Sequence, residues 1–292
     1  MQATLRDTLQ ERLTEKFRKI HGYTPNLSAP EAFNEKILHK MIFDRRRMLT
    51  TFADKIAVRD YVQQRLGSTE LLSRIYRIFD GPDDLYTFEF PSRFVLKANH
   101  GSGWNYIHHG ERPPNRDALV RLGRLWLSSN YALRQGEWCY NDVPPKLFCE
   151  ENLAPDNADV VNYRFYCFSG TARFIQLDFD LHAFHKRNIY DRDWARLDVQ
   201  YNRYPPHPDP PGPPPNLAQM ISIAERLSHG VDFVRVDLYD LGDRVVFGEL
   251  TNYPSAGNGR FHPQTWDGIF GSYWRLSDLT FSTAPSSSMP LG

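Results

Sequence analysis

Cysteine is scarce in this chain, with only Cys139, Cys149 and Cys167 among 292 residues. The three are odd in number and widely spaced, and no C-x-x-C pattern occurs. Disulfide frameworks and structural zinc sites both depend on paired or clustered cysteines. The sequence therefore argues against either and favours buried thiols in a reducing cytoplasm.

Long hydrophobic runs are also missing, and none approaches the ~18 residues needed to span a membrane. The N-terminal stretch 1–20 is charged throughout and lacks the apolar core of a signal peptide. Within it Leu5, Leu9, Leu13 and Phe17 recur every four residues, which predicts an amphipathic helix. We expect a cytoplasmic protein that does not span a membrane.

The chain has no excess charge of either sign, because 35 basic residues balance 35 acidic ones. This balance gives no bulk electrostatic reason to expect nucleic acid or an anionic membrane as a partner, although a local basic groove stays open. Hydrophobic residues make up 41% and aromatic residues 14%, which is enough for a substantial core.

Periodicity and turn signals predict mixed helices and strands without a regular β-α-β alternation. Gly67 is the expected end of one helix and Asn216 the expected cap of another, and eight of the eleven residues 205–215 are proline. The pattern favours α+β lobes with antiparallel sheets. The predicted helices cover 51–66, 117–130 and 216–229, and the predicted strands cover 93–98, 146–150, 163–168, 172–178, 232–239 and 244–250.

Two of these predicted strands carry acidic residues among apolar neighbours. Alternation puts Arg235, Asp237 and Tyr239 on one face of a strand, and Glu249 lies on the next. If the strands pair, Asp237 and Glu249 can converge on one magnesium ion, which prefers hard oxygen ligands. Like charges so close should strain the site without a cation. The competing interpretation is a hairpin with a solvated charged face.

A lysine followed by a glycine-rich turn is the second signal. Lys97 ends a predicted strand and precedes the sequence NHGSG at 99–103, where backbone N–H groups could approach phosphate oxygens. The segment is neither a Walker motif nor a dinucleotide fingerprint. Taken alone, the segment favours a plain hairpin turn over a phosphate-binding loop.

A D-x-D sequence offers a different chemistry. Asp178 and Asp180 match the metal signature of many glycosyltransferases, and His182 and His185 add possible ligands. No further Cys or His completes a zinc set. An active-site loop and an ordinary surface loop both remain open here.

The order of nine short motifs along residues 30–275 is more specific than any one of them. This series resembles the TupA-like ATP-grasp family, which is named for teichuronopeptide biosynthesis and is common among polysaccharide gene clusters. The motifs are FNEK at 33–36, ADK at 53–55 with Arg59, FVLK at 94–97, NHGSG at 99–103, EE at 150–151, YRFYCFSG at 163–170, YDRDW at 190–194, RVDLY at 235–239 and GELT at 248–251.

The resemblance implies an ATP-grasp fold, in which two α+β lobes with antiparallel sheets grip ATP between them. The implied organisation is a helical segment over 1–50, a first lobe over 51–150, a second lobe over 151–279 and a disordered tail over 280–292. It also implies ATP and Mg²⁺ as cofactors. Lys55 and Lys97 resemble the two lysines that hold the ATP phosphates, and Gly101, Ser102 and Gly103 resemble the mobile loop that covers them.

The remaining implied roles concern the nucleoside and the metal. Glu150 and Glu151 fall where such folds meet adenine and ribose. Asp237 and Glu249 resemble the magnesium carboxylates, and Arg235 the arginine that steadies the transferred phosphoryl group.

One departure concerns the third metal ligand. The superfamily usually has Glu-x-Asn at this place, whereas here Thr251 stands at that spacing and Asn252 follows it. Thr251 shares a strand face with Glu249, and Asn252 reaches the ion only if the strand bulges or ends. We predict Thr251 as the third ligand, with Asn252 as the open alternative.

The implied activity is an ATP-dependent carboxylate–amine ligation through an acyl phosphate, which ends in a carbon–nitrogen bond. Its substrates would be a small-molecule or glycan carboxylate and an amine, in the context of a cell-surface polysaccharide or its precursor. Two rivals remain: a metal-dependent glycosyltransferase that uses Asp178 and Asp180, and a nucleotide-binding scaffold without activity.

Overall fold

The computed structural model describes residues 2–154, 160–179 and 184–276. The predicted tail 280–292, Asp180 and His182 lie outside the described residues. The helices are α1 (Gln2–His21), α2 (Phe33–Phe43), α3 (Arg47–Ala53), α4 (Ala57–Leu66), α5 (Arg116–Ser128), α6 (Tyr131–Gln135), α7 (Leu217–Ser228) and α8 (Thr265–Ser272), with 3₁₀ turns η1 (Pro82–Tyr86), η2 (Trp138–Tyr140) and η4 (Pro254–Gly257).

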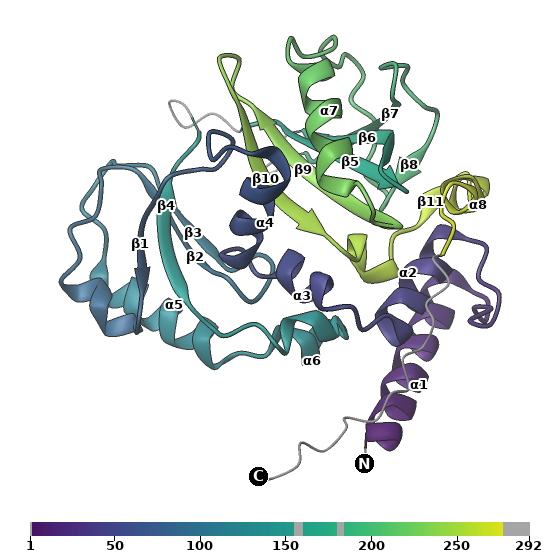
Figure 1. The fold of residues 1–292 in the computed structure, drawn as a ribbon, viewed down its shortest axis with the longest axis horizontal. Helices are drawn as coiled ribbons and strands as arrows, with labels where there is room; N and C mark the ends of the chain where they lie inside the picture. The colour runs from purple at the N-terminus through teal and green to yellow at the C-terminus, as the bar shows by residue number, and fades with distance from the viewer. Residues whose placement is uncertain (1, 155–159, 180–183, 277–292) are drawn as a thin grey trace, which may run out of the picture.

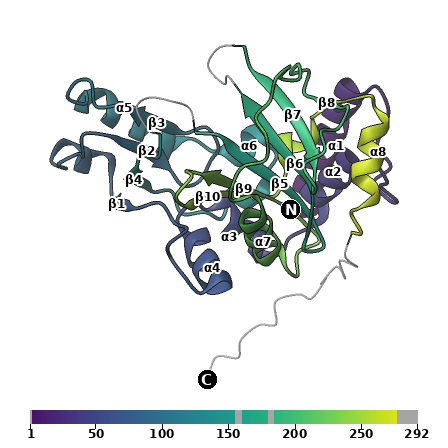
Figure 2. The ribbon, with the colours of Figure 1, turned by 90° about the horizontal axis from the view of Figure 1, so that it is seen from above.

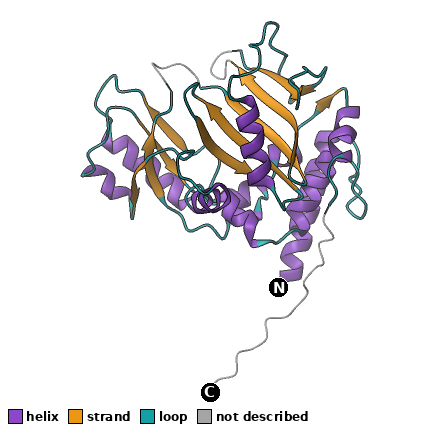
Figure 3. Cartoon of the chain, turned by 45° about the horizontal axis from the view of Figure 1, so that its top comes forward, coloured by secondary structure: helices purple, strands orange, loops and turns teal. Residues whose placement is uncertain are grey.

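The strands form two main antiparallel sheets that stand next to each other and share no strand (Figures 1 and 3). The four-stranded sheet has the order β1 (Ile75–Phe79), β4 (Leu147–Glu151), β2 (Phe94–Ala98), β3 (Asn105–His108). The five-stranded sheet has the order β10 (Val245–Thr251), β9 (Phe233–Asp240), β5 (Asn162–Phe168), β6 (Thr171–Phe179), β7 (Lys186–Asp191). A third, two-stranded sheet pairs β11 (Phe261–His262) with β8 (Gln200–Tyr201).

Helices cover both faces of the five-stranded sheet (Figure 2). On one face α7 and α4 pack over buried Val234, Val236 and Leu238 of β9. On the other face α1, α2 and α8 enclose an aromatic cluster around Phe33 and Phe233. The alternation along β9 explains the division, because successive side chains point to opposite faces of a sheet. Arg235, two residues after Phe233, therefore lies on the aromatic face.

A separate core stabilises the four-stranded sheet. Helix α5 packs against it through Leu119, Val120 and Trp126, which meet Phe94 and Leu96 of β2. The predicted helix 117–130 and strand 93–98 are confirmed in type and nearly in their bounds. Among the described residues, no helix is both long enough and apolar enough to cross a membrane.

The single helix predicted over 51–66 is wrong, because the chain breaks into α3 and α4 at residues 54–56. Asp54 leaves the helical conformation, and its carboxylate accepts hydrogen bonds from the N–H of Ile56 and from the side chain of Asn99, both at 2.9 Å. This turn satisfies the backbone locally in the way short acidic side chains often do. Its consequence is that Lys55 lies at the break, while Gly67 ends α4 in the left-handed conformation as predicted.

The other predicted elements are present with small changes. The hairpin of β5 and β6 turns at Ser169 and Gly170, and the proline-rich stretch 205–215 contains no helix or strand. Asn216 precedes α7, but its side chain does not cap the helix as predicted. Instead its amide donates to Asp240 and to the carbonyl of Gly242, which ties α7 to the β9–β10 turn.

A buried lysine joins α2 to the start of β9. Lys40 is 1% exposed, and its ammonium donates to the carbonyl of Phe233 at 2.7 Å and lies 3.6 Å from Asp232. Arg46 bonds to both Asp232 and Asp44, so the charges form one connected group. Buried charges are tolerated when they are paired in this way.

We predict that Lys40→Ala destabilises the chain by about 2–5 kcal/mol, because the Phe233 carbonyl loses its buried donor, Asp232 keeps only Arg46 as a cationic partner, and a cavity replaces the side chain. Urea unfolding followed by circular dichroism measures the change. Lys19→Ala is the matched control, since Lys19 is a largely exposed lysine that also pairs with a carboxylate. Equal effects of the two substitutions would contradict this view of the core.

Candidate active site

The predicted pairing of the two acidic strands is confirmed, with a bulge that the sequence did not indicate. Strands β9 and β10 are antiparallel, and the register shifts between Phe247 and Glu249. The extra residue is Gly248, where an added Cβ would come within 3.0 Å of the Asp237 carbonyl oxygen. The shift places Glu249 opposite Asp237 and Thr251 opposite Arg235.

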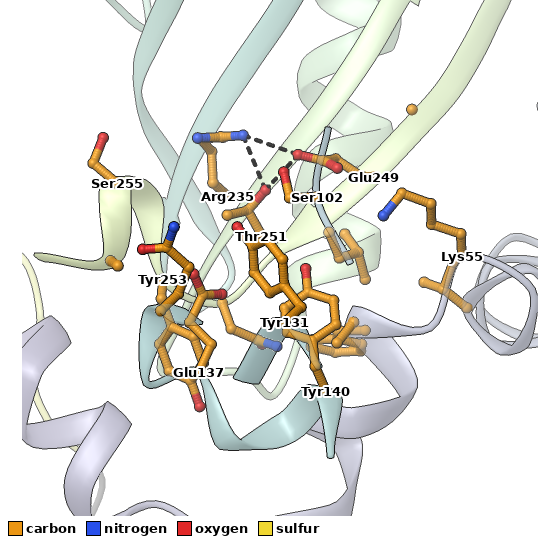
Figure 4. A pocket seen from close by; sticks show the side chains of 18 residues that line it. Lys55, Ser102, Tyr131, Glu137, Tyr140, Arg235, Glu249, Thr251, Tyr253 and Ser255 are labelled. Atoms are coloured by element: carbon orange, nitrogen blue, oxygen red, sulfur yellow. Dashed lines mark hydrogen bonds and ion pairs between the residues drawn. The ribbon is translucent and has the colours of Figure 1, made fainter. Parts of the chain in front are cut away.

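The guanidinium of Arg235 links the side chains of Asp237, Glu249 and Thr251. Arg235 donates to both oxygens of Asp237, from Nε at 2.7 Å and from Nη2 at 2.6 Å. The same Nη2 lies 3.2 Å from Glu249 Oε1 and 2.9 Å from Thr251 Oγ1 (Figure 4). Thr251 in turn donates to Glu249 at 2.9 Å. Both carboxylates therefore reach a single nitrogen, and Arg235 lies where they converge.

The charges of the site depend on this contact. Burial opposes the charge of Arg235, but Asp237 outweighs it and raises the pKa of the guanidinium. Asp237 is 1% exposed, and burial raises the pKa of its carboxyl even though Arg235 opposes the shift. For Glu249 burial also opposes ionisation, but Lys55 and Arg235 together lower its pKa. Arg235 thus offsets part of the strain predicted for two neighbouring carboxylates, while Glu249 still adds to the raised pKa of Asp237.

Lys55 approaches from the first half of the chain. It lies in the break between α3 and α4, and its ammonium donates to the carbonyl of Gly101 in the glycine-rich loop. Burial lowers the pKa of Lys55, and Lys97 adds to this while Glu249 opposes it. At Gly101 an added Cβ would lie 2.5 Å from the ring of Trp104, so only glycine fits without movement. The loop and Lys55 therefore form one unit beside Glu249.

Lys97 and the two glutamates of β4 form a neighbouring group. Lys97 forms an ion pair with Glu150, which raises its pKa in spite of burial. Glu150 also accepts from Ser73 at 2.9 Å. Glu151 accepts from the N–H of Arg74 and pairs with Arg244 of the β9–β10 turn. The side chains of Lys97, Glu150 and Glu151 therefore all bond to other residues of the chain in this structure.

A cavity of about 340 Å³ collects part of the predicted site (Figure 4). Lys55, Ser102, Arg235, Glu249 and Thr251 all line it. Gly101, Gly103, Lys97, Glu150, Glu151 and Asp237 do not. The lining combines the break after α3, the glycine-rich loop and the bulged hairpin, so it joins segments far apart in the sequence.

Residues that no motif indicated form much of the remaining wall. Tyr131, Glu137 and Tyr140 come from α6, η2 and the turn between them, and Tyr253 follows β10. Glu137 is 9% exposed, and burial raises its pKa to about 8, with Glu249 adding to the shift. The stretch around Glu137 lacks a periodic or spaced pattern, so sequence reasoning had no signal with which to find it.

The oxygen atoms of this site are the kind of ligand that a hard cation prefers, but there are too few of them to fill the coordination shell of an ion. Asp237, Glu249 and Thr251 present oxygens around one point, yet no group of three His, Cys, Asp or Glu side chains within the described ranges could hold a metal. Magnesium commonly needs only one or two carboxylates, with water and phosphate oxygens completing its shell. Asn252 turns away from Glu249 and donates to the Leu49 carbonyl at 2.8 Å, so Thr251 is the residue beside the carboxylates.

The D-x-D aspartate is occupied by protein partners. Asp178 bonds to Arg164, to Arg187 and to His185 at 2.9 Å. Burial opposes its ionisation, but Arg164 and Arg187 outweigh burial and hold the pKa of this carboxyl well below its usual range. Both oxygens are used in this way, which gives no support to a metal site at Asp178.

Comparison with solved structures gives ATP-grasp proteins at low identity. The ligase PsnB, in complex with a minimal precursor, is 11% identical with a TM-score of 0.39, and the match covers 70% of this chain and 53% of that one. D-alanine–D-alanine ligase from Bacillus anthracis with ATP is 12% identical with a TM-score of 0.39, covering 70% and 55%. The RimK domain ATP-grasp protein from Sphaerobacter thermophilus is 14% identical with a TM-score of 0.43, covering 91% and 95%.

The chain spans about half the length of the PsnB chain that it matches, and no curated protein gives a significant match. The decisive finding is a family profile described as TupA-like ATPgrasp, which matches residues 35–275. The match covers most of the sequence, and it agrees with the mixed helices and antiparallel sheets of an ATP-grasp fold. The chain belongs to the TupA-like ATP-grasp family.

Proposed function

We propose that this protein is an ATP-dependent carboxylate–amine ligase that works through an acyl phosphate. The observation that supports this best is the convergence of Lys55, Arg235 and Glu249 on one cavity, with Asp237 bound to the same guanidinium. Phosphoryl transfer asks mainly for positioning and charge neutralisation, which such a set of side chains can supply.

We assign the magnesium to Asp237, Glu249 and Thr251, with the remaining ligands from water and phosphate. A bound Mg²⁺ supplies positive charge that offsets the developing charge on the phosphate oxygens. Arg235 bonds to both carboxylates, so it would have to give up Glu249 and one Asp237 oxygen if they held the ion. Its guanidinium would then be available to the transferred phosphoryl group.

Lys55 and Lys97 are our candidates for the ATP phosphates. Lys55 is tied to the Gly101 carbonyl and Lys97 to Glu150, so each lysine exchanges a protein partner for phosphate on binding. Gly101, Ser102 and Gly103 would cover the phosphates. Glu150 and Glu151, at the end of β4, would adjoin adenine and ribose.

The reaction follows from these assignments. A substrate carboxylate oxygen attacks the γ-phosphorus, the bond to the β-γ bridging oxygen breaks, and an acyl phosphate and ADP form. The amine, as its free base, then attacks the acyl carbon, the bond between that carbon and the phosphate oxygen breaks, and phosphate leaves with the proton that the nitrogen loses, so that an amide results. Water would hydrolyse the acyl phosphate, so closure of the 101–103 loop should precede transfer.

The substrates and setting are proposed on the family's context alone. A glycan or small-molecule carboxylate and an amine, used in modifying a cell-surface polysaccharide or its precursor, agree with that context. A cytoplasmic location supplies ATP and suits three buried free cysteines. The glycosyltransferase alternative lacks support, because Asp178 is held by Arg164, Arg187 and His185.

We predict that ATP with Mg²⁺ stabilises the chain, whereas UDP-glucose and GDP-mannose do not. A ligand at one hundred times its Kd contributes about 2.7 kcal/mol, which raises the Tm of a protein of this size by roughly 4–5 °C. Glu249→Gln should weaken Mg²⁺-dependent ATP binding by about tenfold or more, because a charged ligand becomes neutral. Thermal melting with each nucleotide measures both effects.

The control for that experiment is Glu225→Gln, which neutralises a partly exposed glutamate that pairs with Arg192 away from the cavity. It should leave the ATP-dependent shift unchanged. Stabilisation by a sugar nucleotide without any by ATP would overturn the ligase proposal.

A pair of neighbouring substitutions tests the metal assignment. Thr251→Val should reduce Mg²⁺-dependent ATP binding with little change in stability, because its hydroxyl lies beside Glu249. Asn252→Ala should instead lower the free energy of unfolding by about 1–3 kcal/mol, because the Leu49 carbonyl loses its buried donor. Binding titrations and urea unfolding separate the two. The opposite pattern would make Asn252 the ligand.

A further inference from the structure

Glu137 lies on a short turn that the assigned ATP and magnesium roles leave unused. Gly136 ends α6 in the left-handed conformation, with φ of 82°, and η2 begins at Trp138. The Gly136 N–H donates to the carbonyl of Ala132, and a Cβ added at Gly136 would lie 2.7 Å from Leu13 Cδ2 of α1. Glu137 is therefore held by a compact backbone and not by a free loop.

The carboxyl of Glu137 is exceptional among the buried acids. It is 9% exposed, and no hydrogen bond or ion pair to it is formed by any residue that the structure describes. Every other buried carboxylate in those ranges has a bonded partner, namely Glu35, Asp44, Asp54, Glu150, Asp178, Asp232, Asp237 and Asp267. A buried polar group without a partner is costly and asks for an explanation.

The missing partner can come from the cavity. Glu137 lines the cavity that also holds Arg235 and Glu249 (Figure 4). Its oxygens are not among the fully occluded, unpaired atoms, so they keep contact with the open space. Asn252 Oδ1 and the hydroxyl of Tyr253 in the same lining are also unpaired, but both are fully occluded. Among the described residues, no donor of this wall reaches the Glu137 carboxyl.

The charged side chains of the cavity differ between its two sides. Lys55 and Arg235 are cationic and lie near Glu249, whereas Glu137 lies apart from Lys55 across the cavity (Figure 4). Lys16, Lys55 and Arg235 act on Glu137 only at a distance, and none forms an ion pair with it. A ligand that brings negative charge to Lys55 and positive charge to Glu137 matches both walls.

We propose that Glu137 binds the ammonium group of the amine substrate, so that it selects the nucleophile by charge. This rests on the ligase function proposed above. An ammonium has three N–H donors and no acceptor, which is what a buried carboxylate without donors requires. A neutral hydroxyl of the same size would leave the carboxylate charge uncompensated. Without the ammonium, burial favours the protonated acid, in agreement with the pKa of about 8.

The test compares cationic probes with neutral probes of the same shape. Alaninamide and glucosamine carry the ammonium on an amino-acid and an amino-sugar frame, and lactamide and glucose replace it with a hydroxyl. Calorimetric titration into the full chain with Mg²⁺ and ADP measures each affinity. We expect at least one ammonium probe to bind roughly tenfold or more tightly than its neutral counterpart, as for a hydrogen bond to a charged group.

Glu137→Gln should remove this discrimination and leave Mg²⁺-dependent ATP binding unchanged, and Glu137→Asp should keep part of it. The Gln variant should unfold at an equal or higher urea concentration, because its neutral amide has nearly the shape of the protonated acid and cannot ionise in the buried site. Equal binding of ammonium and neutral probes by the natural protein, or undiminished ammonium binding by Glu137→Gln, would overturn the assignment. Failure of the natural protein to bind ATP with Mg²⁺ would instead overturn the ligase proposal.

Discussion

The contact between Arg235 and the two carboxylates of the bulged hairpin holds the site together. Asp237 is almost fully buried in a sheet whose other face is apolar, and an unpaired charge there would be expensive. Bidentate bonding by Arg235 makes its burial tolerable, and the bulge at Gly248 brings Glu249 to the same guanidinium. The hairpin thus holds a cation, Arg235, where the proposed chemistry needs one, and under the proposed function magnesium would replace Arg235 at Glu249 when the nucleotide binds.

Two segments of the first half of the chain place Lys55 and the glycine-rich loop beside this hairpin. The break at residues 54–56 delivers Lys55, and Asp54 holds the break by bonding to Asn99, which begins the glycine-rich loop. The two lysine-bearing segments are therefore mechanically linked. A movement of the loop that breaks the hydrogen bond between Lys55 and Gly101 would free the Lys55 ammonium, whose charge acts on Glu249, so under the proposed function phosphate binding and loop closure should occur together.

Much of this arrangement could be predicted from residue patterns, and the failures have identifiable causes. Alternation along β9 correctly placed Arg235 and Asp237 on one face, since strand periodicity is a local property. The helix predicted over 51–66 failed because the apolar spacing continues through a break that depends on Asn99, distant in sequence. Asn216 failed as a cap because Asp240 competes for its side chain. Glu137 carried no pattern at all, and only the assembled cavity distinguishes it from an ordinary surface glutamate.

The central claim is that a divalent ion takes the place of Arg235 between Asp237 and Glu249. The most direct test is a crystal structure of the full chain with Mn²⁺ and a non-hydrolysable ATP analogue, in which anomalous scattering locates the ion. We expect one anomalous peak in contact with a carboxylate oxygen of Asp237, one of Glu249 and the phosphates, with Arg235 withdrawn from Glu249. A nucleotide-bound ion at Asp178, or a bound nucleotide with Arg235 still joining both carboxylates, would contradict the account.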